Sequence, residues 1–370
     1  MPLLFANHTL IVDPQTNVSY KVIKHIANGG FSEIYLVQPS NNTKLVVLKI
    51  ITTNDVKQKN VLRDEIRVFN MLKNINHQAQ EYLIKYHTNF NYIYHNQTYL
   101  CLILEYFDGM SLRDYLDKNI LLTPSKARLI VQQIGSVLDF FHNLSPRLIH
   151  KDLKPENILI NQSLTKIKLI DYGASYVAYD NKVLTIDDEL KCTTVYASPQ
   201  LVQIDYRQHP YLIFNPQFDL HSLAVLYYEL LTGTDPLHYE RFKKFPKQDI
   251  YYLKAWQTFD FLDLDTINPQ INPATNQLIR NAVLSKSNDK TQIFTSVQDF
   301  LTALKQIENN TQTKGLNRQK NLVLYNDLRS LNKITSSDQP WYMHLGWQIA
   351  MVIFLVCVLL TIIIVVSLVR

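Results

Sequence analysis

The feature that most constrains this chain of 370 residues is a block of polar side chains set between apolar segments near its middle. The run HKDLKPENILI occupies residues 150–160, and KLIDYG follows eight residues later. Transfer of a phosphoryl group needs a carboxylate for the acceptor hydroxyl, oxygen ligands for Mg²⁺ and a cation at the moving phosphate. The block therefore predicts a phosphotransfer site built from Asp152, Lys154, Asn157 and Asp171.

The chain divides into a part rich in strands and a part rich in helices. Four β-rich runs separated by turn residues predict strands at residues 20–27, 33–38, 44–51 and 99–105. Apolar side chains at helical spacing predict helices at residues 57–74, 218–231, 249–256, 275–284 and 296–307. Thr123 and Pro124 predict the start of a further helix, and Gly233 is placed to end the helix at 218–231.

In the order and spacing of these motifs the sequence resembles the eukaryotic-type serine/threonine protein kinase family over residues 18–306. The resemblance implies an α+β, bilobal protein-kinase fold, with a small β-rich N-lobe at about 18–105 and a larger, mostly helical C-lobe at about 109–306. It also implies ATP and Mg²⁺ as cofactors and protein serine and threonine hydroxyls as acceptors. Lys154 within LKPEN, together with Thr193, is similar to serine/threonine rather than tyrosine kinases.

The same resemblance implies a role for each residue of the polar block. Asp152 corresponds to the catalytic-loop aspartate, and Lys154 contacts the γ-phosphate. Asn157 and Asp171 correspond to the ligands of Mg²⁺.

A lysine and a glutamate far upstream complete this set. Glu65 falls on the apolar face of the expected helix, where an unpaired carboxylate would be costly. Lys49, in VVLKI, resembles the strand lysine that binds the α- and β-phosphates, and Glu65 resembles its helix partner. We therefore expect Lys49 and Glu65 to form an ion pair.

The phosphate-binding loop is expected at IANGGFSEIY. Only the middle glycine of the family pattern is kept, at Gly29, because Ala27 and Ser32 stand at the other two positions. The middle glycine matters most, since it lets backbone N–H groups approach phosphate. The residues expected to bind nucleotide here are Ile26, Ala27, Asn28, Gly29, Gly30, Phe31, Ser32 and Ile34.

The hinge between the lobes is expected at LCLILEYFDG. Leu104 takes the gatekeeper position, and Glu105 and Phe107 belong to the segment whose backbone binds adenine in the family.

Supporting residues are implied as well. Asp219 is expected to accept backbone N–H groups of the catalytic loop. Phe69, His150 and Tyr172 resemble the apolar stack that joins the lobes, where the Tyr172 hydroxyl needs a hydrogen-bond partner. His221 is interpreted as a core histidine rather than a ligand.

Two departures keep a second hypothesis open. The glycine loop is poor, and Gln200 in Ser198-Pro199-Gln200 replaces the usual carboxylate of Ala-Pro-Glu. The alternative is a catalytically weak pseudokinase that serves as a scaffold at a membrane. A small-molecule kinase of similar fold is disfavoured by the activation segment with Thr193. Retention of all six polar side chains favours an active enzyme.

The C-terminal segment predicts a membrane anchor. Residues 307–340 are polar, which predicts a juxtamembrane linker, whereas residues 347–369 contain no charged side chain. As a helix, these 23 residues would extend about 35 Å, enough to cross a hydrocarbon core of about 30 Å. Lysine and arginine in the linker favour a cytosolic catalytic domain. We expect a single-pass membrane protein.

Composition excludes several other classes. The chain has 37 Lys plus Arg and 32 Asp plus Glu, so a net charge of +5 gives no reason to expect nucleic acid as a partner. Its three cysteines lie far apart and form neither a disulfide framework nor a zinc site. Protein substrates and the membrane are the expected partners. The oligomeric state stays open, because the C-terminal segment lacks a G-x-x-x-G face.

Overall fold

The computed structural model describes ten parts of the chain: residues 3–30, 32–52, 55–118, 121–179, 182–183, 193–203, 215–237, 264–268, 271–283 and 294–312. The chain forms two compact units, Met1–Arg318 and Gln319–Arg370, and all described residues belong to the first. Several expectations concern residues outside the described ones: Phe31, the helix at 249–256, most of the linker and the anchor at 347–369. No helix in the described part combines the length and apolarity needed to cross a membrane.

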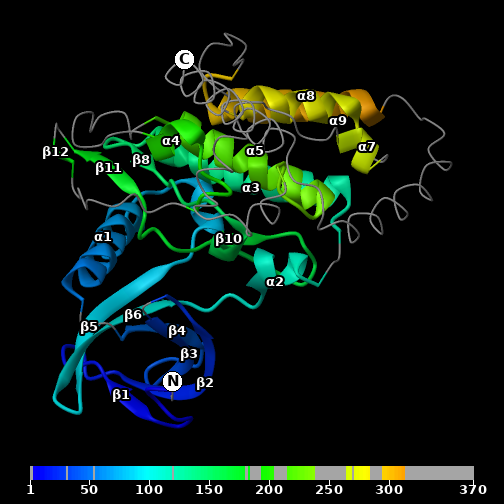
Figure 1. Ribbon diagram of the computed structural model, residues 1–370. Helices are drawn as coiled ribbons and strands as arrows, with labels where there is room; N and C mark the ends of the chain where they lie inside the picture. Colours follow the sequence, from blue (N-terminus) through cyan, green and yellow to red (C-terminus); the bar gives the residue numbers. More distant parts are fainter. Residues whose placement is uncertain are drawn as a thin grey trace, which may run out of the picture. The chain divides into compact units, whose positions relative to one another are not determined.

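The N-lobe is built on one six-stranded antiparallel sheet in the order β1-β2-β3-β4-β6-β5 (Figure 1). Its strands are β1 (Leu10–Val12), β2 (Ser19–Asn28), β3 (Ser32–Pro39), β4 (Val46–Ile51), β5 (Tyr86–Tyr94) and β6 (Gln97–Glu105). One long helix, α1 (Val56–Lys73), connects β4 to the rest of the lobe. The single helix and the strands at β2, β3, β4 and β6 agree with the sequence prediction.

Three N-lobe elements were not predicted. They are β1, β5 and the 3-10 helix η1 (Gln78–Tyr82). β1 has only three residues, too few to show an alternating pattern, and β5 contains asparagines that weaken its strand signal. The folded lobe therefore begins before residue 18, the expected start of the domain.

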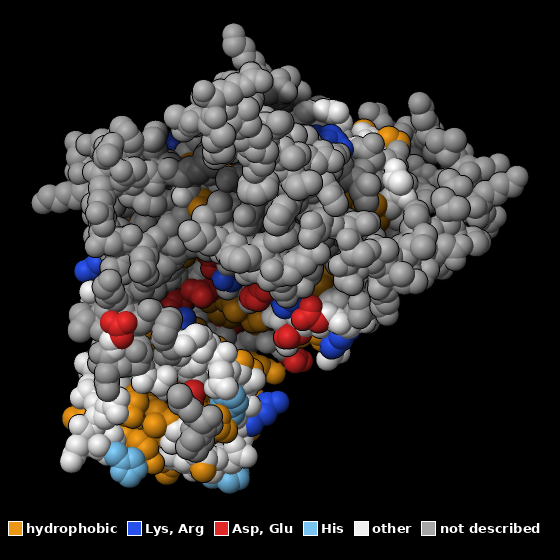
Figure 2. All heavy atoms as spheres, in the orientation of Figure 1, with side chains coloured by type: hydrophobic (Ala, Val, Ile, Leu, Met, Phe, Trp, Pro, Cys, Tyr) orange, Lys and Arg blue, Asp and Glu red, His pale blue; other side chains and the backbone are white. Residues whose placement is uncertain are grey.

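The C-lobe is mostly helical. Its helices are α2 (Leu112–Leu116), α3 (Pro124–His142), α4 (Pro199–Gln203), α5 (Gln217–Thr232), α7 (Leu264–Ile267), α8 (Pro273–Ala282), α9 (Val297–Gln312) and the 3-10 helix η2 (Pro155–Asn157). Short strands complete it: β7 (Met110–Ser111), β8 (Leu148–Ile149), β9 (Ile158–Ile160), β10 (Ile167–Leu169), β11 (Tyr176–Tyr179) and β12 (Lys182–Val183). In the space-filling view, acidic and basic side chains gather beside the hollow between the two lobes (Figure 2).

The predicted helix signals hold in the C-lobe. Thr123 is the N-cap of α3, its hydroxyl accepting from the Lys126 N–H at 3.4 Å, and Pro124 is the first helical residue. Gly233 ends α5 with φ of 79°, a left-handed conformation that suits glycine. Helix α9 continues to Gln312, so helical structure extends past the expected domain end at residue 306.

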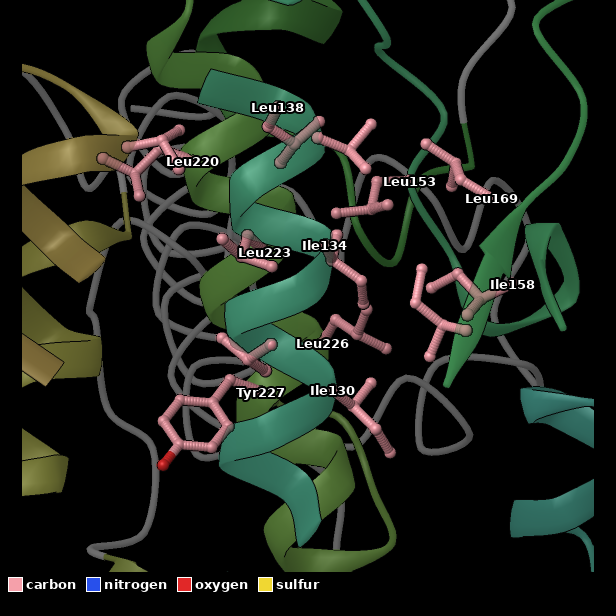
Figure 3. Close-up of a cluster of buried hydrophobic side chains, with 14 of the residues drawn as sticks. Ile130, Ile134, Leu138, Leu153, Ile158, Leu169, Leu220, Leu223, Leu226 and Tyr227 are labelled. Carbon is pink, nitrogen blue, oxygen red and sulfur yellow. The ribbon is translucent and has the colours of Figure 1, made fainter. Parts of the chain in front are cut away.

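The core of the C-lobe is the packing of α3 against α5. Figure 3 shows Ile130, Ile134 and Leu138 of α3 between α5 and the segments that carry the polar block. Two of those segments contribute Leu153 and Ile158, both fully buried. Apolar burial stabilises the fold by about 25 cal/mol per Å², and here it also fixes the loop that contains Asp152, Lys154 and Asn157.

His221 provides a test of the α5 packing. Helix α5 is buried on every side, and His221 is 0% exposed, as expected for a core histidine. Burial disfavours the imidazolium and lowers the pKa of His221 to about 3 from 6.5. Below pH 6.5 the His221 imidazole is protonated in the unfolded chain but stays neutral in the folded chain. The free energy of unfolding therefore falls as the pH drops from 6.5 towards 3. At pH 5 the loss is about 2 kcal/mol, at about 1.4 kcal/mol per pKa unit.

Replacing His221 by Phe should remove that part of the acid sensitivity. We expect His221→Phe to lose less stability than the wild-type protein between pH 7.5 and pH 5, by about 2 kcal/mol. Urea unfolding at both pH values measures the difference. Equal losses in the two proteins would contradict the buried, neutral histidine.

Candidate active site

Lys49 and Glu65 form the ion pair that the sequence predicts. The Lys49 Nζ lies 2.9 Å and 2.7 Å from the two carboxylate oxygens of Glu65, and Glu65 is 1% exposed. Burial alone would lower the pKa of Lys49, but Glu65 and Asp171 raise it above its ordinary value. Lys49 therefore stays charged at neutral pH, and this charge explains why a carboxylate lies on the apolar face of α1.

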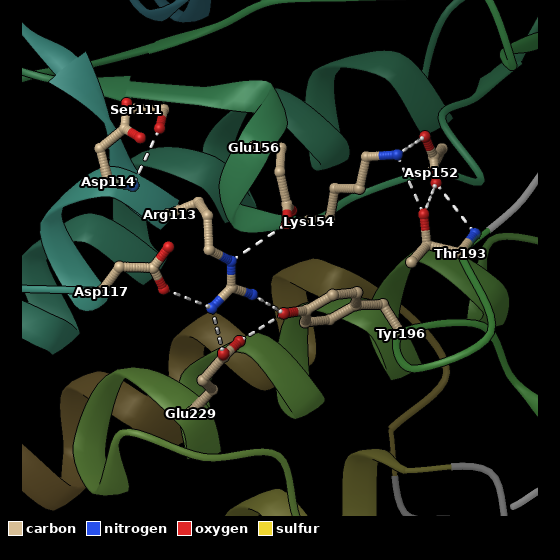
Figure 4. A network of polar contacts seen from close by, with 10 residues as sticks. All are labelled: Ser111, Arg113, Asp114, Asp117, Asp152, Lys154, Glu156, Thr193, Tyr196 and Glu229. Atoms are coloured by element: carbon tan, nitrogen blue, oxygen red, sulfur yellow. Dashed lines mark hydrogen bonds and ion pairs between the residues drawn. The ribbon is translucent and has the colours of Figure 1, made fainter. Parts of the chain in front are cut away.

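Asp152 and Lys154 lie together with Thr193 (Figure 4). The Lys154 Nζ is 2.6 Å from Asp152 Oδ2 and donates to Thr193 Oγ1 at 2.9 Å. Asp152 Oδ1 accepts from the Thr193 hydroxyl at 2.7 Å and from its N–H at 3.0 Å. The Asn157 side-chain nitrogen also donates to Asp152 Oδ2 at 3.3 Å. One carboxylate is thus oriented by a cation and three donors, which fixes its direction for a proton transfer.

Asn157 and Asp171 provide oxygen atoms beside this cluster. The Asn157 side-chain nitrogen donates to the Asp152 carbonyl at 2.9 Å, which leaves the amide oxygen as the atom that can bind a metal. The Asn157 carbonyl accepts from the Ile170 N–H at 2.9 Å and so places Asp171 next to it. Desolvation would raise the pKa of Asp171, but Lys49 and the Gly173 N–H hold it below its ordinary value. An ionised carboxylate and a carbonyl oxygen are ligands that Mg²⁺ prefers.

Asp219 accepts backbone N–H groups of the catalytic loop, as predicted. Its carboxylate accepts from the N–H groups of His150 at 2.9 Å and Lys151 at 2.8 Å. A third partner was not predicted: the ring of His142, whose Nε2 lies 2.8 Å from Asp219 Oδ2. A fully buried carboxylate with three partners makes the loop rigid.

The predicted aromatic stack is formed. Tyr172 packs edge-on against Phe69 at 5.2 Å between ring centroids and against His150 at 6.1 Å. The Tyr172 hydroxyl finds the expected partner, donating to the Leu169 carbonyl at 3.1 Å. Tyr86 extends the stack by lying parallel to Phe69 at 5.2 Å, a contact that the sequence did not reveal. The stack joins α1 to the segment that carries Asp171.

The expected phosphate loop connects β2 to β3. Ala27 and Asn28 are exposed at the end of β2, and the Gly29 N–H donates to the Ser32 carbonyl at 2.7 Å. A Cβ added at Gly29 would lie 2.5 Å from the Ser32 hydroxyl oxygen, so the kept glycine allows this close approach. Ile34 pairs in register with both Ala27 and Lys49. Through Ile34, the strand pairing places the end of β2, where the loop begins, next but one to Lys49 on β4.

The remaining expected nucleotide contacts lie at the ends of β2 and β6. Ile26 is 43% exposed on β2, and Gly30 is exposed with open space around it. Leu104 is buried on β6, and Phe107 is half-buried just after it.

Glu105 has a partner that the sequence did not suggest. Its carboxylate lies 2.8 Å from Lys168 Nζ and accepts from the Lys85 N–H at 3.1 Å. Lys168 is buried and also donates to the Leu83 carbonyl at 2.9 Å. The side chain of Glu105 therefore ties the expected hinge to the strand that precedes Asp171, and its contact with nucleotide stays a prediction.

Arg113 joins four separate segments in a second polar network (Figure 4). Its guanidinium donates to Glu156 at 3.0 Å, to Glu229 at 3.0 Å and to the Tyr196 hydroxyl at 2.6 Å. The Tyr196 hydroxyl in turn donates to Glu229 at 2.5 Å. These residues come from α2, η2, α5 and the segment after Thr193, so the network holds the catalytic loop against the helices.

Comparison with known families agrees with this geometry. Residues 20–310 match the protein kinase domain. The chain belongs to the protein kinase family. The bilobal arrangement around Lys49, Asp152 and Asp171 is that of a kinase domain. The expected α+β protein-kinase fold is confirmed as a kinase domain that contains both helices and strands.

Curated relatives narrow the class of this kinase. It is 25% identical over 270 residues to a candidate serine/threonine-protein kinase of Mycoplasma pneumoniae, covering 71% of this chain and 68% of that protein. It is 27% identical over 291 residues to the tousled-like 2 serine/threonine kinase of Xenopus tropicalis, covering 76% of this chain but 40% of the relative. The TOUSLED kinase of Arabidopsis thaliana is 24% identical over 293 residues and is also covered to 40%. The prediction of a protein serine/threonine kinase is confirmed.

Proposed function

We propose that this kinase transfers the γ-phosphate of ATP to serine and threonine hydroxyls of proteins. The observation that carries the proposal is the carboxylate of Asp152, held at 2.6 Å from Lys154 and at 2.7 Å from the Thr193 hydroxyl. In this role Asp152 accepts the proton of the acceptor hydroxyl, and Lys154 balances negative charge on the transferred phosphate. Both side chains retain some exposure, 14% and 22%, which a group that meets substrate requires.

Asn157 and Asp171 are the proposed ligands of Mg²⁺. They fit this ion for two reasons. Lys49 keeps the Asp171 carboxylate ionised, and Asn157 makes its hydrogen bond to Asp152 through the side-chain nitrogen, so the amide oxygen can bind a metal. When bound, Mg²⁺ would neutralise charge on the phosphate oxygens of ATP. Lys49, oriented by Glu65, would add a fixed positive charge at the α- and β-phosphates.

The nucleotide itself is proposed to lie against the loop and the hinge. Backbone N–H groups of the loop would receive phosphate, apart from that of Gly29, which donates to the Ser32 carbonyl. Ile26, Ile34, Leu104 and Phe107 would offer apolar surface to adenine. Ala27, Gly29 and Ser32 are small enough to leave the backbone accessible.

An active enzyme is favoured over the pseudokinase scaffold. A scaffold that only binds a partner has no need for the Lys49–Glu65 pair or for an aligned Asp152, and the described residues form both. Incubation of the full chain with Mg·ATP and a generic protein acceptor should give phosphoserine and phosphothreonine, and chelation of Mg²⁺ should stop the reaction. Absence of transfer even in the presence of Mg·ATP would favour the pseudokinase scaffold instead.

We further propose that residues 347–369 anchor the kinase in a membrane with its catalytic domain in the cytosol. The support is the uncharged run of 23 residues and the basic linker before it. The full chain should stay with membranes after alkaline extraction, whereas a chain ended after Gly315 should be released. Release of the full chain would contradict the anchor.

A further inference from the structure

The first residues of the chain form a strap on the N-lobe sheet, ahead of the expected kinase domain. We define the N-terminal strap as residues 3–12, which end in β1. The His8 N–H donates to the Val22 carbonyl at 2.7 Å, and the Val22 N–H donates to the Thr9 carbonyl at 2.9 Å. The strap is thus attached to β2 by backbone hydrogen bonds, although its Leu10 side chain is 60% exposed.

The strap is also attached to β3, the strand that follows the phosphate loop. The Leu4 N–H donates to Glu33 Oε2 at 2.9 Å, and the Phe5 N–H donates to the Tyr35 hydroxyl at 3.1 Å. The Tyr35 hydroxyl donates to Glu33 as well, so the two β3 side chains and the two strap amides form one connected group. Glu33 pairs in register with Asn28, the last residue of β2 before the loop turns.

Phe5 anchors the strap in a cluster of aromatic rings. It is 2% exposed, and its ring centroid lies 5.7 Å from Tyr35, 5.9 Å from Tyr92 and 5.3 Å from Tyr94. Tyr92 and Tyr94 belong to β5, at the opposite edge of the sheet from β1. Phe5 therefore connects the two edges of the sheet.

A continuous set of contacts leads from Phe5 to the phosphate loop. The Tyr35 ring, which touches Phe5, packs edge-on against His25 at 5.4 Å between centroids. The His25 Nε2 lies 3.0 Å from the side-chain oxygen of Asn28. The strap thus reaches the loop along two routes, through Glu33 opposite Asn28 and through Tyr35 and His25.

We propose that the N-terminal strap positions the phosphate loop for ATP, with Phe5 as a positioning residue. This inference rests on the proposed function, because it assigns the loop to ATP phosphates. The loop keeps one of the three glycines of the family pattern, and its backbone N–H groups must point at phosphate for binding. A loop that is ordered before ATP arrives loses less conformational entropy on binding. The strap supplies this order from outside the loop.

The test compares Phe5→Ala with Leu10→Ala in the full chain. Both remove an apolar strap side chain, but Leu10 is exposed and lies outside the connected group. We expect Phe5→Ala to raise the Kd and the KM for Mg·ATP about three- to tenfold, with kcat changed less than about twofold. Leu10→Ala should match the wild-type protein, and Phe5→Leu should recover most of the affinity. Amide hydrogen exchange at residues 28–30 and 32–34 should be faster in Phe5→Ala alone.

Three results would overturn the proposal. One is an equal ATP Kd in Phe5→Ala and Leu10→Ala, and another is a loss of kcat at unchanged KM. If Phe5→Ala does not fold, Tyr35→Phe replaces it in the test, because this change keeps the ring and removes only the hydroxyl that accepts from the Phe5 N–H. The third result is then an unchanged ATP Kd and unchanged loop exchange in Tyr35→Phe. A wild-type protein that binds ATP but transfers no phosphate would contradict the proposed function and leave this Kd comparison valid.

Discussion

Replacing Asp152 by Asn is expected to lower the rate of phosphate transfer by about 100-fold or more. The change keeps the shape of the side chain and removes the group proposed to accept the hydroxyl proton, and general-base and positioning effects each contribute at this level. The carboxylate oxygens of Asp152 now accept from Lys154 at 2.6 Å and from Thr193 at 2.7 Å. In Asp152→Asn one of these oxygens becomes an NH₂ group, which donates and cannot accept, so one of the two contacts would be lost. Radiolabel transfer from ATP to a generic acceptor measures the rate.

A matched control separates this effect from a general loss of charge. Glu81 is an exposed carboxylate whose partner, Lys166, lies 3.5 Å away on the surface. Glu81→Gln should keep the wild-type rate, because exposed ion pairs contribute about 0–1 kcal/mol to stability. Equal transfer by the wild-type protein and Asp152→Asn would contradict the role assigned to Asp152.

Replacing Lys49 by Met is expected to produce the second large loss, about 100-fold in kcat/KM for ATP. The change removes a fixed charge proposed to bind the α- and β-phosphates, and loss of one preorganised electrostatic group costs about 10²- to 10³-fold. It also leaves the buried Glu65 carboxylate without the Lys49 ammonium at 2.7 Å, which disturbs the position of α1. Initial rates over a range of ATP concentrations measure the effect.

The neighbouring Lys44 offers a control for Lys49. Lys44 is exposed just before β4, so Lys44→Met should leave kcat/KM unchanged. A Lys49→Met protein that remains folded and retains the wild-type kcat/KM would show that Lys49 does not bind the triphosphate.

The order and spacing of the motifs, together with the family resemblance, predicted which residues lie together in the candidate site, and their catalytic and binding roles stay predictions. The spacing of Asp152, Lys154 and Asn157 is set within one loop, and β9 and β10 then bring Asp171 beside them. The same holds for caps and stops, because the signals at Thr123 and Gly233 act within one helical turn. Such features depend on residues close in sequence, and their physical consequences do not require knowledge of the rest of the fold.

Contacts between distant segments could not be predicted in the same way. Arg113 meets Glu229 across more than a hundred residues, and neither side chain belongs to a pattern that marks it. Lys168 resembles an ordinary alternating strand residue until its buried pairing with Glu105 is seen. The strap was missed because β1 has three residues and Phe5 lies in no periodic segment. Each of these depends on which faces of the fold meet.

The affinity of the full chain for ATP, measured with and without Mg²⁺, tests most directly whether the six polar side chains act on one metal-bound triphosphate. With Asn157 and Asp171 as oxygen ligands next to the charged Lys49, ATP should bind markedly more tightly when Mg²⁺ is present. An affinity for ATP that is the same in Mg²⁺ and in chelator would contradict a metal-dependent phosphotransfer site.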